Sequence, residues 1–222
     1  MILITFAVPQ ESRGVVARCR RAAGLSQFGG QEVFVLHTGM GGPAAEKAVR
    51  KAIEEFQPAW VLSSGFAGGL DPQIRAGALL ASANSSSPSL LKGLPPEIAR
   101  AAFCSTERPL DTPAAKAAQF GKTGAAAVDL ESASIAAICQ GADIPLLVLR
   151  LVSDAADEAL PLPSTVAYDF TRQRIRHLAI AGHLATHPWR IPALARFVRQ
   201  LPGWQEKLAA ALEAVVQKAP QP

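Results

Sequence analysis

The stretch that decides the fold is VFVLHTGMGGPAAEKAVRKAIEEFQPAWVLSS, residues 33–64. It starts with an apolar, β-branched run, passes through a glycine turn at 38–43, and continues with Ala, Val and Ile at helical spacing. Pro58 ends the helical pattern, and a second apolar run follows at 60–64. Strand, turn, helix and strand in this order are typical of an α/β domain with a parallel or mixed sheet.

The alternation continues on both sides of this stretch. Further strands are predicted at residues 2–8, 77–83 and 145–153, the last being a continuous apolar run that suits a strand buried on both faces. Residues 125–141 lead into a helix that is expected to begin near Leu130. Residues 83–97 are rich in Ser, Pro and Gly and are predicted to be the least regular part.

The C-terminal part departs from the alternation. Residues 165–187 and 203–219 have the pattern of amphipathic helices, and the Pro-rich segment 188–202 joins them. We therefore predict an α/β fold in a single domain, residues 1–222, with a central mixed twisted sheet flanked by helices. Its part from residue 160 onward is expected to be mainly helical.

Composition limits the kind of protein. Of 222 residues, 49% are hydrophobic and 18% charged, the proportions of a globular protein with a sizeable core. The start of the chain has no basic leader, and no apolar run reaches the roughly 18 residues of a membrane span, so a cytoplasmic location is expected. Three widely spaced cysteines indicate neither disulfides nor a zinc site, and no metal or cofactor is expected.

The net charge of +4 is unevenly distributed. No Asp or Glu occurs from Phe170 to Gln205, where six arginines alternate with apolar and aromatic residues. Residues 170–205 are therefore either a surface that contacts an anionic membrane peripherally or a pair of ordinary amphipathic helices packed on the core. A nucleic-acid partner is not expected, because no recognised binding motif accompanies the charge.

Four polar or glycine-rich clusters follow the ends of predicted strands. They are "PQES" at 9–12, "TGMGG" at 38–42, "GFAGG" at 65–69 and "SDAADE" at 153–158. Ligands of α/β sheets bind beyond the carboxyl ends of the strands, so all four clusters are predicted to line one cleft. The three glycines of "GFAGG" either let the backbone approach a ligand or only form a tight turn.

The acids of "SDAADE" also have two interpretations. A carboxyl group that emerges from a buried strand is desolvated, which raises its pKa and suits a proton donor. Alternatively, Ser153 or Asp154 caps a helix. Two nucleotide motifs are disfavoured: "GMGGPA" at 39–44 lacks an acidic residue after the next strand, and "GKT" at 121–123 has Lys116 where a phosphate-binding loop needs Gly.

The motifs "AVPQES", "TGMGG", "SSGFAGGLDP", "AVDLESASIA" and "LRLVSDAAD", in this order, resemble the nucleoside phosphorylase and nucleosidase superfamily that includes methylthioadenosine/adenosylhomocysteine nucleosidase. "TGAAAVDLES", "SDAADEALP" and "IPALARFVRQL" are most similar to its hopanoid-associated branch, which acts on adenosylhopane. The resemblance implies a homo-oligomeric purine nucleosidase whose substrate is an adenosine-type, lipid-linked nucleoside. A phosphate-dependent phosphorylase and a non-catalytic nucleoside-binding protein stay open as alternatives.

The resemblance also implies roles for residues. Asp154 corresponds to the acid that protonates the leaving purine at N7, and Glu131 to the group that holds the ribose hydroxyls. Glu11 corresponds to the carboxylate that either activates water or stabilises positive charge on the sugar. The other implied substrate-binding residues are Gly39, Gly65, Phe66, Ala67, Gly68, Leu130 and Ser153. Asp129, at the predicted entrance of a helix, is expected to cap it rather than to contact substrate.

Three departures from the family pattern matter. Phe66 stands where the nucleosidases have a small residue, which leaves the water or phosphate pocket undefined. Ser63 and Ser64 replace the arginine with which phosphorylases hold phosphate, and this favours hydrolysis unless Arg13 compensates. Residues 104–112, which should supply an aromatic to stack on the base, contain none.

Overall fold

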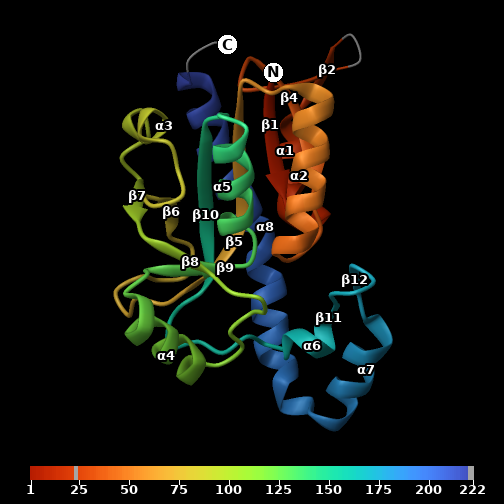
Figure 1. The fold of residues 1–222 in the computed structure, drawn as a ribbon. Helices are drawn as coiled ribbons and strands as arrows, with labels where there is room; N and C mark the ends of the chain where they lie inside the picture. The colour runs from red at the N-terminus through yellow and green to blue at the C-terminus, as the bar shows by residue number, and fades with distance from the viewer. Residues whose placement is uncertain (23–24, 220–222) are drawn as a thin grey trace.

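The computed structural model describes residues 1–22 and 25–219 and has a central sheet with helices on both faces (Figure 1). The strands of this sheet are β1 (Ile2–Phe6), β2 (Arg20–Ala22), β3 (Leu25–Phe28), β4 (Gln31–His37), β5 (Trp60–Gly69), β6 (Leu79–Ser82), β7 (Ile98–Ala101), β8 (Phe103–Ser105), β9 (Ala127–Asp129) and β10 (Leu146–Asp154). The helices are α1 (Pro9–Arg18), α2 (Gly42–Phe56), α3 (Pro88–Lys92), α4 (Pro113–Thr123), α5 (Ser132–Gly141), α6 (Ser164–Ala167), α7 (His177–Thr186) and α8 (Ile191–Lys218).

The sheet is mixed, as predicted. Its order is β2-β3-β4-β1-β5-β10-β6-β7, and β9 pairs with both β5 and β8. The pairs β1/β4, β1/β5 and β5/β10 are parallel, whereas β10/β6 and β5/β9 are antiparallel. The predicted sequence of strand, glycine turn, helix and strand is confirmed as β4, α2 and β5.

Each central strand supplies side chains to two apolar cores. Ile2 and Ile4 of β1 face the core under α1 and α8, while Leu3 between them faces the core under α2 and α5. This period of two explains why the central strands are apolar throughout. Gly14 lets α1 lie close to α8, since a Cβ there would be 2.4 Å from the Gln205 carbonyl oxygen.

The N-terminal part contains elements that the sequence prediction missed. β4 is the fourth strand rather than the second, because α1 and the antiparallel pair β2/β3 precede it. Residues 83–97 are largely irregular as predicted, but they include the short helix α3.

The C-terminal part corrects two predictions. Residues 165–187 are not one helix, since the hairpin of β11 (Tyr168–Asp169) and β12 (Arg174–Ile175) separates α6 from α7. The Pro-rich segment 188–202 is helical rather than a linker: a short 3₁₀ helix, η1 (Pro188–Arg190), leads into α8. Pro192 lies in the first turn of α8, where no amide needs a helical partner, and Pro202 removes one interior bond.

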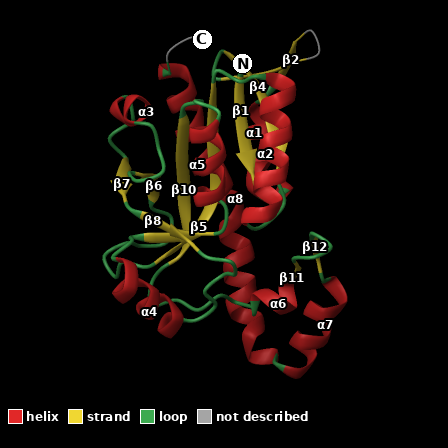
Figure 2. Ribbon diagram, viewed as in Figure 1, coloured by secondary structure: helices red, strands yellow, loops and turns green. Residues whose placement is uncertain are grey.

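The parallel strands β1, β5 and β10 end at the same edge of the sheet. Figure 2 shows α6, α7 and the first half of α8 beyond this edge, while the second half of α8 packs on the sheet. The loops that follow these strands therefore lie between the carboxyl edge of the sheet and the C-terminal elements α6, α7 and the first half of α8. Within the described residues, no helix combines the length and apolar character that crossing a membrane requires.

Candidate active site

A cavity of about 440 Å³ lies at the carboxyl edge of the sheet. The acids Glu11, Glu131 and Asp154 all line it, and residues from each of the four predicted clusters contribute. Of the other predicted site residues, the lining includes Phe66, Ala67, Gly68, Leu130 and Ser153. Gly39 and Gly65 lie outside this lining: Gly39 adjoins Gln173, and Gly65 adjoins Glu11.

Glu11 is held by three backbone amides. Its Oε2 accepts hydrogen bonds from the amides of Ala7 (3.0 Å) and Val8 (3.3 Å), and its Oε1 accepts one from Phe66 (3.0 Å). Burial raises the pKa of the carboxyl group, and the amides and the charge of Arg150 partly oppose this. The Phe66 side chain points to α8, where its ring meets Trp204 edge to face at 6.2 Å. The backbone of Phe66, rather than its ring, therefore faces the catalytic candidate.

Gly65 is required by this arrangement. Its φ is +144°, and a Cβ atom there would lie 2.9 Å from Oε1 of Glu11. Only glycine combines such a backbone conformation with so close an approach of a carboxylate. The "GFAGG" cluster thus brings the β5 backbone against Glu11.

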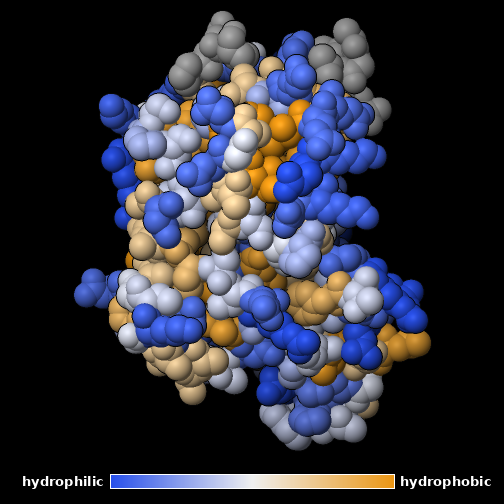
Figure 3. Space-filling model, viewed as in Figure 1, coloured by the Kyte–Doolittle hydropathy of each residue, from blue (hydrophilic) through white to orange (hydrophobic). Residues whose placement is uncertain are grey.

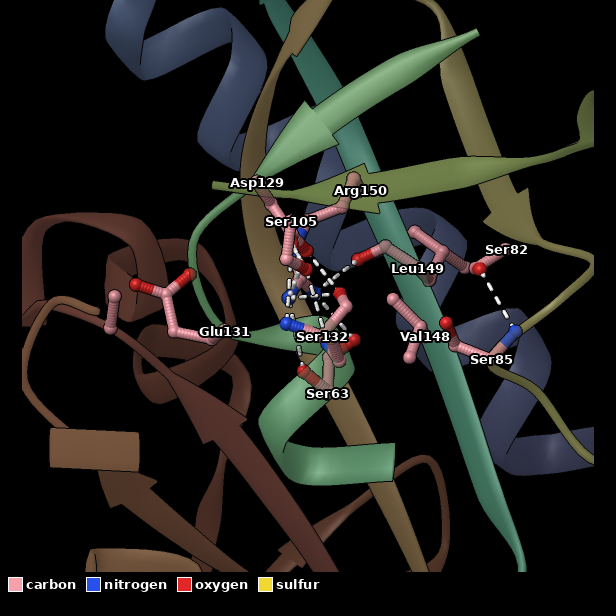
Figure 4. A network of polar contacts seen from close by, with 12 residues as sticks. Ser63, Ser82, Ser85, Ser105, Asp129, Glu131, Ser132, Val148, Leu149 and Arg150 are labelled. Carbon is pink, nitrogen blue, oxygen red and sulfur yellow. Dashed lines mark hydrogen bonds and ion pairs between the residues drawn. The ribbon is translucent and has the colours of Figure 1, made fainter. Parts of the chain in front are cut away.

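Glu131 and Asp129 point in different directions, as Figure 4 shows. Glu131 precedes α5 instead of lying in its first turn, and its Oε1 accepts a 2.7 Å hydrogen bond from the amide of Gly41. Burial is the main cause that raises the pKa of Glu131 to about 7, and the negative charge of Asp129 adds to it. Glu131 is thus turned toward the cavity, with one oxygen anchored at the glycine turn.

Asp129 lies at the start of α5, where it was predicted to cap the helix, and it also lines the cavity. It accepts hydrogen bonds from the Ser132 amide (3.1 Å) and from Ser105 Oγ (2.8 Å), and it pairs with Arg150 at 2.9 Å (Figure 4). Arg150 also donates to the Ser63 carbonyl oxygen at 2.8 Å. Sequence reasoning missed Arg150, although a lone charge inside the apolar run of β10 was a signal.

Asp154 ends β10 and is held on both oxygens. Ser153 Oγ donates to Oδ1 at 2.6 Å, and the ammonium group of Lys116 forms an ion pair with Oδ2. Lys116 is fully buried and also donates to the carbonyl oxygens of Ala155 and Glu158, each at 2.7 Å. Lys116 was missed as well, because nothing in the pattern of α4 indicates that a lysine lies under the strand end.

A small hollow adjoins the cavity behind Glu11 and Glu131. Its volume is about 10 Å³, and Thr5, Ser64 and Arg150 also line it. The hydroxyl groups of Thr5 and Ser64 are buried and have no hydrogen-bond partner within residues 1–22 and 25–219. The space matches one water molecule. Arg13 is exposed and lines neither the cavity nor the hollow.

The outer part of the cavity is apolar. Its walls come from the C-terminal elements, and they include Tyr168, Phe170, Ile180, Leu194, Phe197 and Leu201. Segment 104–112 contributes Thr106, Pro109 and Leu110 to the lining, and the hairpin contributes the aromatic side chains of Tyr168 and Phe170. Gln173 fastens the hairpin to the glycine turn, since it accepts from the Met40 amide (2.7 Å) and donates to the Met40 carbonyl oxygen (3.0 Å).

A comparison with protein families tests the resemblance. The family model described as "Phosphorylase superfamily" matches residues 10–87 and 79–184, most of the chain. The chain belongs to the phosphorylase superfamily. The predicted enzyme superfamily is thereby confirmed.

The fold of this chain is also similar to the folds of solved structures. One is a 5'-methylthioadenosine/S-adenosylhomocysteine nucleosidase from Neisseria meningitidis, with a TM-score of 0.70 and 16% sequence identity, where the match covers 98% of this chain and 99% of that chain. Another is the corresponding nucleosidase from S. pneumoniae, with a TM-score of 0.69 and 16% identity, where the match covers 98% of each chain. The chain is also similar to futalosine hydrolase of Helicobacter pylori, with a TM-score of 0.66 and 18% identity, where the match covers 98% of this chain and 97% of that chain. At these identities the likeness shows the fold, which confirms the predicted fold class.

The raised pKa of Glu131 predicts a pH dependence of stability. The folded protein holds this proton up to about pH 7, whereas an unfolded chain releases it near 4.5. The stabilisation, roughly 3 kcal/mol, is therefore fully present below pH 4.5 and is lost as the pH rises through about 7. Glu131→Gln should remove this loss, which urea unfolding between pH 4.5 and 7.5 would measure.

A matched control is Glu46→Gln, which changes an exposed carboxylate on α2. This control should keep the wild-type pH dependence. If the free energy of unfolding changed with pH in the same way in wild type and in Glu131→Gln, the raised pKa of Glu131 would be contradicted.

Proposed function

We propose that this phosphorylase-superfamily protein is a nucleosidase that hydrolyses the N-glycosidic bond of an adenosine-type nucleoside with a large apolar 5' substituent, such as adenosylhopane. The observation that carries the proposal is the convergence of Glu11, Glu131 and Asp154 on one cavity beside a water-sized hollow. The resemblance to the hopanoid-associated branch supports the substrate class.

In this proposal the base leaves as Asp154 delivers a proton to N7. Cleavage passes through an oxocarbenium-like state, in which the departing purine gains electron density and needs a proton. Ser153 and Lys116 hold the two carboxyl oxygens of Asp154. The proton that Asp154 passes to N7 comes from the Lys116 ammonium group through Oδ2, and Lys116 is left neutral. Gly68 lies close to this carboxyl group, since a Cβ there would be 3.3 Å from Oδ2.

In this proposal Glu131 binds the ribose and Glu11 activates the attacking water. Glu131 keeps one oxygen on the Gly41 amide and uses its lone pairs to accept the ribose hydroxyls, while Leu130 packs against the sugar. Glu11 accepts the proton of the attacking water, and the pKa raised by burial makes it a stronger base. Water attacks the anomeric carbon as the bond to the base breaks.

The hollow supports water rather than phosphate as the nucleophile. Its volume of about 10 Å³ is that of one water, far too small for a phosphate ion. Arg150, which lines it, is already engaged by Asp129 and by the Ser63 carbonyl oxygen. Arg13 does not replace it, because Arg13 lies at the surface.

The outer cavity supports an apolar 5' substituent. The 5' carbon of a ribose is attached at C4', across the ring oxygen from the carbon that carries the base, and the outer walls of the cavity are apolar and aromatic side chains of the hairpin, α7 and α8. Such walls stabilise a hydrocarbon chain in proportion to the area that it buries. A charged or strongly polar 5' group finds few partners there.

The test is base release from a panel of nucleosides with and without phosphate. We expect free adenine from 5'-methylthioadenosine and faster release, as kcat/KM, from a long-chain 5'-alkylthioadenosine, both independent of phosphate. If base release required phosphate, the protein would be a phosphorylase rather than a hydrolase. Failure to release base from any adenosine-type member, despite binding, would favour a non-catalytic nucleoside-binding protein and overturn the proposal.

A further inference from the structure

The C-terminal part exposes apolar side chains to an unusual degree. Of the six large hydrophobic side chains that are exposed in the described residues, five lie between residues 175 and 198: Ile175, Leu178, Trp189, Ile191 and Val198. Leu178 is 90% exposed and Trp189 is 68% exposed. The helix α7 is largely apolar in sequence, and yet it buries no residue. Such a concentration marks an interaction surface rather than chance exposure.

The same region carries a net positive charge, although Asp169 at its border lies near Arg172 and Arg174. Its six arginines are Arg172, Arg174, Arg176, Arg190, Arg196 and Arg199, and none forms an ion pair in the part of the chain that the structure describes. No acidic residue occurs from Phe170 to Gln205. Figure 3 shows blue and orange atoms side by side at this end of the molecule. The partner of this surface must therefore be both apolar and anionic.

We propose that the residues exposed between Ile175 and Arg199 form a docking surface for an anionic phospholipid bilayer. Leu178, Ile191 and Val198 insert at the boundary between headgroups and acyl chains, where a tryptophan such as Trp189 is also favoured. The exposed arginines of this surface, Arg176, Arg196 and Arg199, pair with lipid phosphates. Exposed apolar groups beside arginines that form no ion pair within the described residues have the composition of an interfacial surface.

A second copy of the chain fits this surface less well. A two-fold contact brings the same patch of each copy together, so that the arginines of one would face the arginines of the other. Like charges in contact repel, and the patch has no acid to offset them. The charge therefore favours the bilayer.

The docking surface is continuous with the cavity. Ile175 and Val198 line the cavity and are also exposed, by 36% and 52%. A nucleoside with an apolar tail can therefore pass from the bilayer into the cavity without exposing the tail to water. This passage rests on the proposed function, whereas the docking surface itself rests only on exposure and charge.

Vesicle flotation tests the docking surface. We expect wild type to float with vesicles of phosphatidylcholine and phosphatidylglycerol, less with phosphatidylcholine alone, and less at high salt. The variant Leu178→Asp/Trp189→Asp should bind at least about tenfold more weakly, since two inserted apolar groups are lost. The matched control is Val16→Asp, which changes an exposed apolar residue of α1 and should bind like wild type.

Further measurements separate this proposal from the proposed function. Leu178→Asp/Trp189→Asp should keep the wild-type melting temperature and the wild-type turnover of 5'-methylthioadenosine, and Asp154→Asn should keep vesicle binding. Wild type that does not float, or a double variant that floats as well as wild type, would overturn the docking surface. A double variant whose mass by light scattering falls below that of wild type would identify a contact between copies instead, and would equally overturn it.

Discussion

Replacing Asp154 with Asn is expected to lower kcat for base release by about 100- to 10,000-fold, with little change in nucleoside affinity. The amide group of Asn has the size of the carboxyl group and can still accept the hydrogen bond from Ser153, but it cannot pass a proton to the leaving purine. Rapid-quench measurement of free base, together with a binding titration of an unreactive nucleoside, would separate the two effects.

The control for this variant lies on the same loop. Asp157→Asn removes an acid that is 76% exposed and lies 3.9 Å from Arg75, and its turnover should match wild type. Because Lys116 loses its counter-charge in Asp154→Asn, the melting temperature must be measured alongside. Unchanged turnover in a folded Asp154→Asn protein would remove Asp154 from the reaction.

Replacing Arg150 with Met is expected to cost about 3–5 kcal/mol of the free energy of unfolding. The change leaves the carboxylate of Asp129 buried without its ionic partner, and it removes a donor to the Ser63 carbonyl oxygen. Urea unfolding at neutral pH would measure the loss, and reduced activity should accompany it because Arg150 borders the water-sized hollow.

Arg75→Met is the matched control, since Arg75 is 75% exposed in its pairing with Asp157. An exposed pair of this kind contributes at most about 1 kcal/mol. If Arg150→Met destabilised the protein no more than Arg75→Met does, the ion pair under the site would not support the fold.

The core of the fold could be predicted from the sequence because its signals are local. The run from residue 33 to 64 contains two strand patterns and a helical pattern, each in its own window, and the structure confirms them as β4, α2 and β5. Parallel strands then bring their following loops to one edge, so the approach of Glu11 and Asp154 followed from the topology. Glu131 follows β9, which is antiparallel to β5, and it was expected at the site only from the resemblance.

The remaining features depend on contacts between distant parts of the chain. Lys116 reaches Asp154 only because α4 packs beside the end of β10, and no local pattern encodes that contact. The hairpin at 168–175 interrupts an apparently helical pattern because Gln173, with φ of 51°, bonds to Met40 across the site. Helix α8 includes Pro202 because burial of Trp204, Leu208 and Leu212 outweighs one missing hydrogen bond.

The most direct test of the central claim is to identify the atom that replaces the base at the anomeric carbon. The protein would be incubated with a 5'-alkylthioadenosine in ¹⁸O-labelled water that also contains phosphate, and the sugar product would be analysed by mass spectrometry. We predict free adenine and a sugar with one ¹⁸O atom at its anomeric carbon, because Glu11 activates water from the hollow beside it. A sugar 1-phosphate without the label would contradict this account.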